Sequence, residues 1–422
     1  MRKHAMTIVA CASLLMCLAT APAEAQTLTL DECISKATAN YPAVKKYGLI
    51  EKTRDYNLSN AARSWLPQIG VSAGAYAFTD IIDADMLSKM EAEMENYLIT
   101  GSLTISQNIY DAGQSAAARR TARAQAEVET KQVDVTIYEV EERVEQVFFG
   151  LLMLEEQTEQ NRLLQDDLAI TYRSVESMMT GGIANESDLE AVRVEQIKAE
   201  QAEGSLRSMH RAYLRMLGVL MGESLGEGVK LAAVSEDLQP SASDGFLKRP
   251  EMSLFNAQES LIDAQRKQLN TRLRPTLSAF AAGITHTSVT SIMRNSVLAG
   301  GLSLSWNFGA LYTRKNDIGK LEAQRKSVAS DRETFIFNTR LEEEDTNGAI
   351  ESLRTQIAQD AEIVRLRESI RSKSERKVQL GTESVNEMLR DINAVSQARQ
   401  QLALHEIELK KELYNLNHIM GK

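Results

Sequence analysis

The sequence predicts a mixed α and β membrane protein in which long helices alternate with short strands, arranged as an internal two-fold repeat. Three observations lead to this fold class: the spacing of the prolines, four short segments of alternating polarity, and motifs that recur in the same order in both halves. The prolines are Pro22, Pro42, Pro67, Pro240, Pro250 and Pro275. Because proline interrupts helix interiors, long unbroken helices are possible from 68 to 239 and after 275.

The first 25 residues are typical of a secretory signal peptide. Arg2 and Lys3 give a positive start, an apolar stretch follows, and Ala23-Glu24-Ala25 supplies the small-x-small pattern that a signal peptidase cleaves. We therefore expect residues 1–25 to be removed before Gln26. After that point there is no apolar stretch of about 18 residues, so no transmembrane helix is predicted.

Composition excludes several classes of protein. The net charge of −10 gives no electrostatic support to nucleic-acid binding. With 25% charged and 43% hydrophobic residues, the chain is neither a disordered tail nor a polytopic helical membrane protein. Cys11 and Cys17 lie inside the signal segment and fit a lipidation box poorly, which leaves Cys33 as the single cysteine of the processed chain and no internal disulfide.

Helical periodicity predicts two long helices, each followed by a shorter one. The expected ranges are 112–179 with 186–219, and 310–379 with 384–419. The first long range carries a heptad seam, with apolar residues spaced alternately by four and three, which suits helix-on-helix packing. The seam consists of Val133, Ile137, Val140, Val144, Val147, Leu151 and Leu154. The helices alone are equally compatible with a coiled-coil scaffold.

Four short segments alternate between apolar and polar residues with the period of a β-strand, at about 65–80, 97–110, 275–289 and 298–309. Their lengths suit bilayer-spanning strands, and both tryptophans, Trp65 and Trp306, lie at or in these segments. A soluble sheet with one buried face would show the same alternation. Bacterial barrels begin at about eight strands, so several chains would have to pool their strands.

The two halves of the chain repeat each other. Gly101-Ser102-Leu103-Thr104-Ile105-Ser106 recurs as Gly300-Gly301-Leu302-Ser303-Leu304-Ser305, and the turn from Gly182 to Leu189 recurs from Gly381 to Met388 at the same offset. We therefore expect a first repeat at 26–221, a polar linker at 222–249 and a second repeat at 250–422. Each repeat should hold a helix, two strands, a long helix and a shorter helix.

The ordered motifs resemble those of the TolC-like outer-membrane efflux protein family. They are the opening Leu28-Thr29-Leu30-Asp31-Glu32-Cys33 with Asn40-Tyr41-Pro42, the Leu-Pro strand entry, the Gly-Leu-Ser-Leu-Ser-Trp strand and Arg249-Pro250-Glu251. The resemblance covers residues 27–420. It implies a homotrimer in which four transmembrane strands from each chain form a twelve-stranded outer-membrane β-barrel, continued by a periplasmic α-barrel of long helical hairpins.

By the same resemblance, the protein is an exit duct for efflux or type I secretion that conducts substrates passively through the cell outer membrane and the periplasm. The implied partners are a periplasmic adaptor (membrane fusion) protein, an inner-membrane transporter of the RND, ABC or MFS type, and outer-membrane lipid. No cofactor, metal or enzymatic activity is implied. The sequence names neither the cargo nor the transporter.

The turns after the long helices are the candidate functional site. Gly182 and Gly381 are helix-stop residues, and Asn185 and Ser384 are suited to cap the helices that follow. In the family these turns lie at the periplasmic tip, where the duct narrows and adaptors bind.

Acidic residues near these turns are the candidate gate. The resemblance places Glu387 at the family's constriction, with Asp188 as its counterpart in the first repeat, and Asp391 lies one helical turn beyond Glu387. Arg390 stands where the family often has a second acid, and Glu383 replaces its basic residue, so a closing salt bridge from Asp188 is in doubt. The alternative is that these carboxylates are solvated charges near a helix start.

Other chemistry has weaker support in the sequence. Gly222-Glu223-Ser224-Leu225-Gly226 fits a nucleophile elbow, which would make the protein a hydrolase, but it follows a predicted helix instead of a strand. Met86, Met90 and Met94 recur every four residues. Their sulfur atoms could bind a soft metal ion, but we favour the interpretation that they form one face of an external loop. A periplasmic scaffold or adaptor without a membrane barrel remains the main alternative function.

Overall fold

The computed structural model describes residues 27–77, 97–226, 228–234, 245–287 and 296–421. The expected signal peptide and the segment with Met86, Met90 and Met94 lie outside these residues. Among the described helices, none combines the length and the apolar character that crossing a membrane requires.

The chain divides into two compact units. We call Lys45–Thr136 with Lys248–Asn338 the strand unit, and Met1–Val44, Ile137–Leu247 and Thr339–Lys422 the helical unit. Each unit contains parts of both halves of the chain, so the compact units cut across the sequence repeat.

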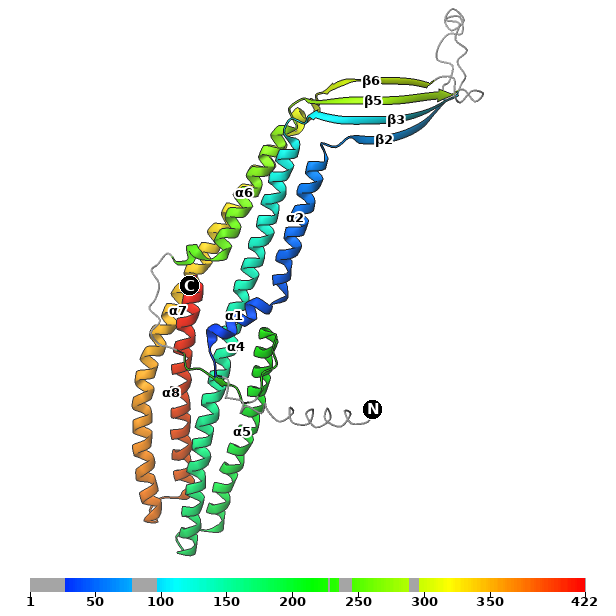
Figure 1. Ribbon diagram of the computed structural model, residues 1–422. Coiled ribbons are helices and arrows are strands. Elements are labelled where there is room, and N and C mark those ends of the chain that lie inside the picture. The colour runs from blue at the N-terminus through cyan, green and yellow to red at the C-terminus, as the bar shows by residue number, and fades with distance from the viewer. Residues whose placement is uncertain (1–26, 78–96, 227, 235–244, 288–295, 422) are drawn as a thin grey trace, which may run out of the picture. The chain divides into compact units, whose positions relative to one another are not determined.

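The strand unit holds one antiparallel sheet of β2 (Gln68–Ala77), β3 (Tyr97–Tyr110), β5 (Thr276–Thr287) and β6 (Ser296–Ser305). The strand order is β2-β3-β5-β6, so two hairpins are joined through the β3–β5 pair (Figure 1). The strand expected at 298–309 ends earlier than predicted, at Ser305. Asn307 Oδ1 accepts a hydrogen bond of 2.8 Å from Gly309 N, which turns the chain into the next helix directly after β6.

Four helical segments accompany this sheet in the strand unit: α2 (Lys45–Arg63), the start of α4 (Gln114–Thr180), α6 (Pro250–Thr271) and the start of α7 (Gly309–Gln379). Neighbouring segments are linked by polar contacts. Thr121 Oγ1 donates to Gln268 Oε1 between α4 and α6 at 3.1 Å, and Arg332 pairs with Glu259 between α7 and α6 at 3.4 Å. Ser64 and Ser115 share a hydrogen bond of 2.8 Å where α2 ends and α4 begins.

The helical unit contains α1 (Leu30–Asn40), the later parts of α4 and α7, α5 (Glu186–Met221) and α8 (Val385–Ile419). It also contains a short 3-10 turn at Pro42–Val44 and all but the last residue of another at Gly245–Lys248. Seam residues Val144, Val147 and Leu151 pack with Phe148 and Phe149 in its core, as the heptad spacing predicted. Of the seam, only Ile137 is half-buried, and the others are buried.

Part of the expected linker pairs with the start of the described chain. Strand β4 (Lys230–Leu231) pairs in parallel with β1 (Thr27–Leu28), and Ala232 N donates to Leu28 O at 2.8 Å. This pairing holds the start of the described chain against residues that follow the first half.

Candidate functional site

Both long helices end at a glycine in the left-handed conformation. Gly182 has φ +75° and Gly381 has φ +69°. Ile183 N donates to Met178 O at 2.9 Å, and Thr382 N donates to Lys377 O at 2.9 Å. These bonds satisfy carbonyls at the helix ends and reverse the chain, so both glycines stop their helices as the sequence predicted.

Two of the candidate gate carboxylates belong to capping boxes. Asp188 N donates to Asn185 Oδ1 at 3.1 Å while Asn185 N donates to Asp188 Oδ2 at 3.0 Å. At the second turn, Glu387 N donates to Ser384 Oγ at 3.3 Å, and Ser384 N donates to Glu387 Oε2 at 3.3 Å. The spacing Ser-x-x-Glu is a known signal for this arrangement, and our sequence analysis identified only the first member of each box.

Capping engages only one of the two carboxylate oxygens of Glu387. Both hydrogen bonds from Ser384 reach Oε2, whereas Oε1 makes no hydrogen bond within the described chain. Glu387 is exposed, and Asp391 and Asp188 are half-buried. The negative charge of Glu387 therefore coexists with its role at the helix start.

Asp188 and Glu383, the two positions at which a closing salt bridge was in doubt, each contact another residue in the structure. Glu383 pairs with Lys377 of its own turn at 3.4 Å, and its side chain is only 16% exposed. Asp188 is engaged with Asn185. Because both Glu383 and Asp188 are acidic, these two positions offer no attraction to each other.

The two turns adjoin each other. A side-chain Cβ at Gly381 would lie 3.9 Å from Ile183 Cγ2. Beneath them, both hairpins bury apolar residues in one cluster, which contains Leu168, Val175, Val192, Ala199, Val378, Val385, Met388, Leu389 and Ile392.

Polar contacts also join the two hairpins. Arg371 on α7 donates to both carboxylate oxygens of Asp167 on α4, at 2.6 and 2.9 Å. Burial lowers the pKa of Arg371, but the hydrogen bonds to Asp167 and Glu375 outweigh it and raise the pKa overall. Asn393 on α8 donates to Glu195 on α5 at 3.0 Å. No sequence signal identified these pairs, because their members lie about 200 residues apart.

The structure gives no support to the nucleophile-elbow interpretation. Ser224 follows α5, which ends at Met221, and Gly222 caps that helix with φ +72°, so no strand precedes the serine. Within the described chain, no group of three or more His, Cys, Asp or Glu residues is placed to hold a metal ion.

One family model matches part of the chain. Residues 33–222 match the model of the family described as outer membrane efflux protein. A comparison with curated protein sequences finds no significant match.

Solved structures of similar fold cover nearly the whole chain. The outer membrane protein VceC of Vibrio cholerae is 14% identical, with 93% of this chain and 96% of that chain covered and a TM-score of 0.66. The CmeC outer membrane channel of Campylobacter jejuni is 14% identical over 93% and 85% of the two chains, with a TM-score of 0.66. The MtrE outer membrane channel of Neisseria gonorrhoeae, solved in its open state, is 12% identical over 93% and 88%, also at 0.66. The resemblance to the TolC-like outer-membrane efflux proteins is therefore confirmed, by the family match over residues 33–222 and by the fold over 93% of the chain.

Proposed function

We propose that this protein is the outer-membrane channel and exit duct of a tripartite efflux or type I secretion system. It conducts passively the substrates that an inner-membrane transporter expels. The observation that carries the proposal is the sheet of the strand unit, which has one exposed apolar face and free edges.

One face of the sheet is apolar from edge to edge. In register across it lie Val71, Leu103, Gly283 and Leu298, and Val71 and Leu298 are 80% and 88% exposed. The same face carries Ile69, Ile105, Leu302 and Leu304, all of them exposed. Apolar side chains in such a continuous exposed layer favour contact with lipid.

The opposite face is more polar, especially on β2 and β3. It carries Ser72, Ser102, Thr104 and Ser106, and the hydroxyls of Ser72 and Ser102 lie 2.7 Å apart. Ile284 and Val297 are apolar exceptions on β5 and β6. A lipid-facing layer backed by a more polar layer is the pattern of a transmembrane barrel strand.

The outer elements of the strand unit suit pairing with copies of the chain. Strands β2 and β6 form the two edges, and because the sheet has four antiparallel strands, β6 of one copy can pair antiparallel with β2 of the next. No residue of α2 is buried, nor is any α7 residue before Thr339. Exposed aromatic residues on these helices include Tyr56 at 68%, Tyr312 at 86% and Phe337 at 67%.

Three copies supply the twelve strands of a closed barrel, and the solved structures of similar fold support this assembly by being outer-membrane channels. We further propose that the homotrimer works with a periplasmic adaptor and an inner-membrane transporter, as the family resemblance implies. No enzymatic step is needed for this role.

The test is extraction and imaging. The protein is expressed with its signal peptide, extracted from outer membranes in detergent and examined by negative-stain electron microscopy. Hollow particles with three-fold symmetry, which conduct ions when added to planar bilayers, are expected. Protein that stays soluble without detergent, or particles without a lumen, would favour the scaffold alternative and reject the channel.

We also propose that Glu387, with Asp391 and Asp188, narrows and charges the duct at the turns of Gly182 and Gly381. Rings of carboxylates favour cations in pores. Glu387→Gln removes the charge but keeps an oxygen to accept the capping bond from Ser384 N, so it separates the two roles of this residue.

The matched control is Ser384→Ala, which disrupts the cap and keeps the charge. We expect Glu387→Gln to weaken cation selectivity in planar bilayers while Ser384→Ala leaves it unchanged. If the wild type and Glu387→Gln have the same cation selectivity, or if only Ser384→Ala changes it, then Glu387 acts only as a capping residue.

A further inference from the structure

Exposed basic side chains gather where the helices of the strand unit adjoin the sheet. One ends α2, two lie between α6 and β5, and three lie in the early turns of α4 and α7. We call them the basic collar: Arg63, Arg120, Arg272, Arg274, Arg314 and Lys315. All six are exposed, and none forms an ion pair with another described residue.

Several exposed basic residues elsewhere in the described chain pair with a neighbouring carboxylate, whereas the six collar residues do not. In the helical unit, Arg162 pairs with Glu159 at 2.7 Å and Arg207 pairs with Glu203 at 2.9 Å. The collar is also unexpected from composition, because the whole chain has a net charge of −10. Its positive charge is therefore local and available to an anionic partner.

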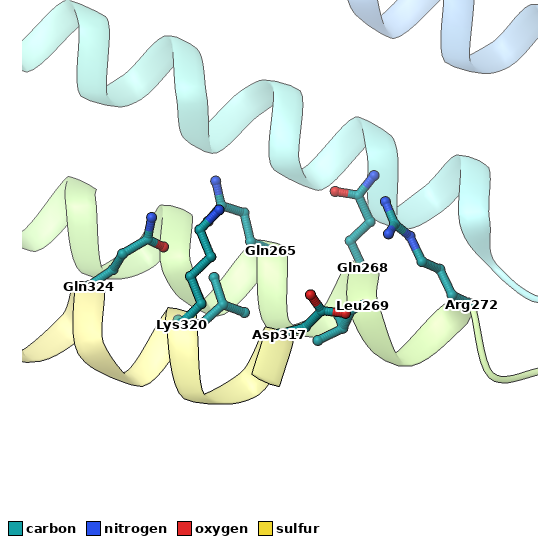
Figure 2. Close-up of a pocket in the computed structure, with 8 residues that line it drawn as sticks. Gln265, Gln268, Leu269, Arg272, Asp317, Lys320 and Gln324 are labelled. Atoms are coloured by element: carbon teal, nitrogen blue, oxygen red, sulfur yellow. The ribbon is translucent and has the colours of Figure 1, made fainter. Parts of the chain in front are cut away.

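Two polar grooves between α6 and α7 lie within the collar. Figure 2 shows the first, of about 330 Å³, with Arg272, Gln268, Gln265 and Lys320 extending from the two helices. Arg272 also lines the second groove, of about 370 Å³, together with Arg314. Asp317 lines both grooves and accepts a hydrogen bond from Thr313 Oγ1 at 3.0 Å. Paired cations and side-chain amides in such grooves suit the oxygens of a phosphate group.

The collar also lies next to the aromatic end of the sheet. Trp306 and Phe308, each 53% exposed, stand between β6 and α7. Aromatic residues of this kind mark the membrane interface in barrels. Arg314 and Lys315 follow the first residue of α7 by five and six positions, which is about 8–9 Å along a helix. Long basic side chains cover such a distance toward lipid headgroups.

We propose that the basic collar binds the phosphate headgroups of anionic phospholipids in the leaflet that adjoins the helix end of the sheet. This inference rests on the proposed function, because it requires the apolar sheet face to lie in a membrane. Contact with the collar would anchor the barrel at a fixed depth and select anionic lipid around it.

The native tryptophans report on this contact. The chain has two, Trp65 and Trp306, and both lie at the boundary between sheet and helices. The full protein is reconstituted with brominated phosphatidylglycerol or brominated phosphatidylcholine, and quenching of tryptophan fluorescence measures how often each lipid is adjacent. Since one basic residue near an anionic surface contributes about fivefold in binding, we expect phosphatidylglycerol to be preferred by about fivefold or more.

The decisive variant replaces all six collar residues by glutamine. Its matched control replaces six exposed basic residues of the helical unit by glutamine, which removes the same charge: Arg162, Arg193, Lys198, Arg207, Arg354 and Arg365. The preference should fall to about one in the collar variant and persist in the control, and high salt should reduce it in the wild type.

The outcomes are distinguishable. No quenching by either lipid means that the sheet is not in a membrane, and the proposed function fails. Equal quenching by both lipids in the wild type, or a preference that survives in the collar variant, overturns the collar alone. The wild-type channel could instead show no lipid preference but change its ion selectivity when inorganic phosphate is added. That result would mean that the collar binds soluble anions, and it would also overturn the proposal.

Discussion

The contact between Asp167 and Arg371 offers a direct test of how the two hairpins of the helical unit are held together. Arg371 makes a two-pronged interaction with Asp167, and the side chains are 17% and 25% exposed. Arg371→Ala leaves the Asp167 carboxylate half-buried without its cation. The apolar cluster around Leu168 and Val378 remains, so the hairpins should loosen locally without unfolding.

The expected magnitude lies between two known limits. Breaking a fully buried ion pair costs about 3–5 kcal/mol, and an exposed pair contributes about 0–1 kcal/mol. With a quarter or less of each side chain exposed, we expect about 2 kcal/mol in the free energy of local opening. A change of that size speeds hydrogen exchange about 30-fold for amides that exchange by local opening.

Hydrogen–deuterium exchange followed by mass spectrometry, on the protein in detergent, measures the change in the rate of local opening. Peptides around Asp167 and Arg371 should exchange faster in Arg371→Ala, while peptides from β3 should not change. Arg365→Ala is the matched control, because Arg365 pairs with Glu362 on the same helix with 68% and 52% exposure, and its effect should be below about twofold.

A double-mutant cycle with Asp167→Ala completes the test. Because the two side chains contact each other directly, the effects of the two single changes should be less than additive, with a coupling of about 1–2 kcal/mol. Strict additivity, or an Arg371→Ala effect no larger than that of Arg365→Ala, would refute the reasoning.

Three further predictions concern single residues. Burial raises the pKa of the Cys33 thiol to about 11, so maleimide at neutral pH should label it only after denaturation, and rapid labelling of native protein contradicts its burial. Burial, with Glu141 and Glu142 nearby, raises the pKa of the Glu145 carboxyl from its ordinary value of 4.5 to about 8. The contribution of Glu145 to the free energy of unfolding is therefore fully present below pH 4.5 and is lost as the pH rises through about 8. Thermal melting of Glu145→Gln should therefore depend less on pH than that of the wild type between about pH 5 and pH 9, and parallel pH profiles would contradict this. Gly381→Ala places a Cβ at φ +69°, which costs about 1 kcal/mol and should lower the melting temperature, whereas Gly319→Ala inside α7, with open space around it, should be neutral or stabilising.

The candidate site was predicted only in part. The stop glycines and the first capping residues were found because glycine and capping preferences act within a few residues. The second members of the capping boxes, Asp188 and Glu387, carry the same kind of local signal in their spacing. Their capping role is a finding of the structure, and their gate role stays a proposal.

The sequence by itself determined the local elements of this protein. Heptad spacing, strand alternation and proline placement each depend on neighbouring residues, so they place long helices and four strands close to their observed positions. Only the tertiary structure decided which elements meet: the β3–β5 pair that joins the two halves, the β1–β4 pair after α5, and the Asp167–Arg371 contact. These contacts join residues far apart in the chain, and they are selected by packing and charge across surfaces that no local pattern of residues describes.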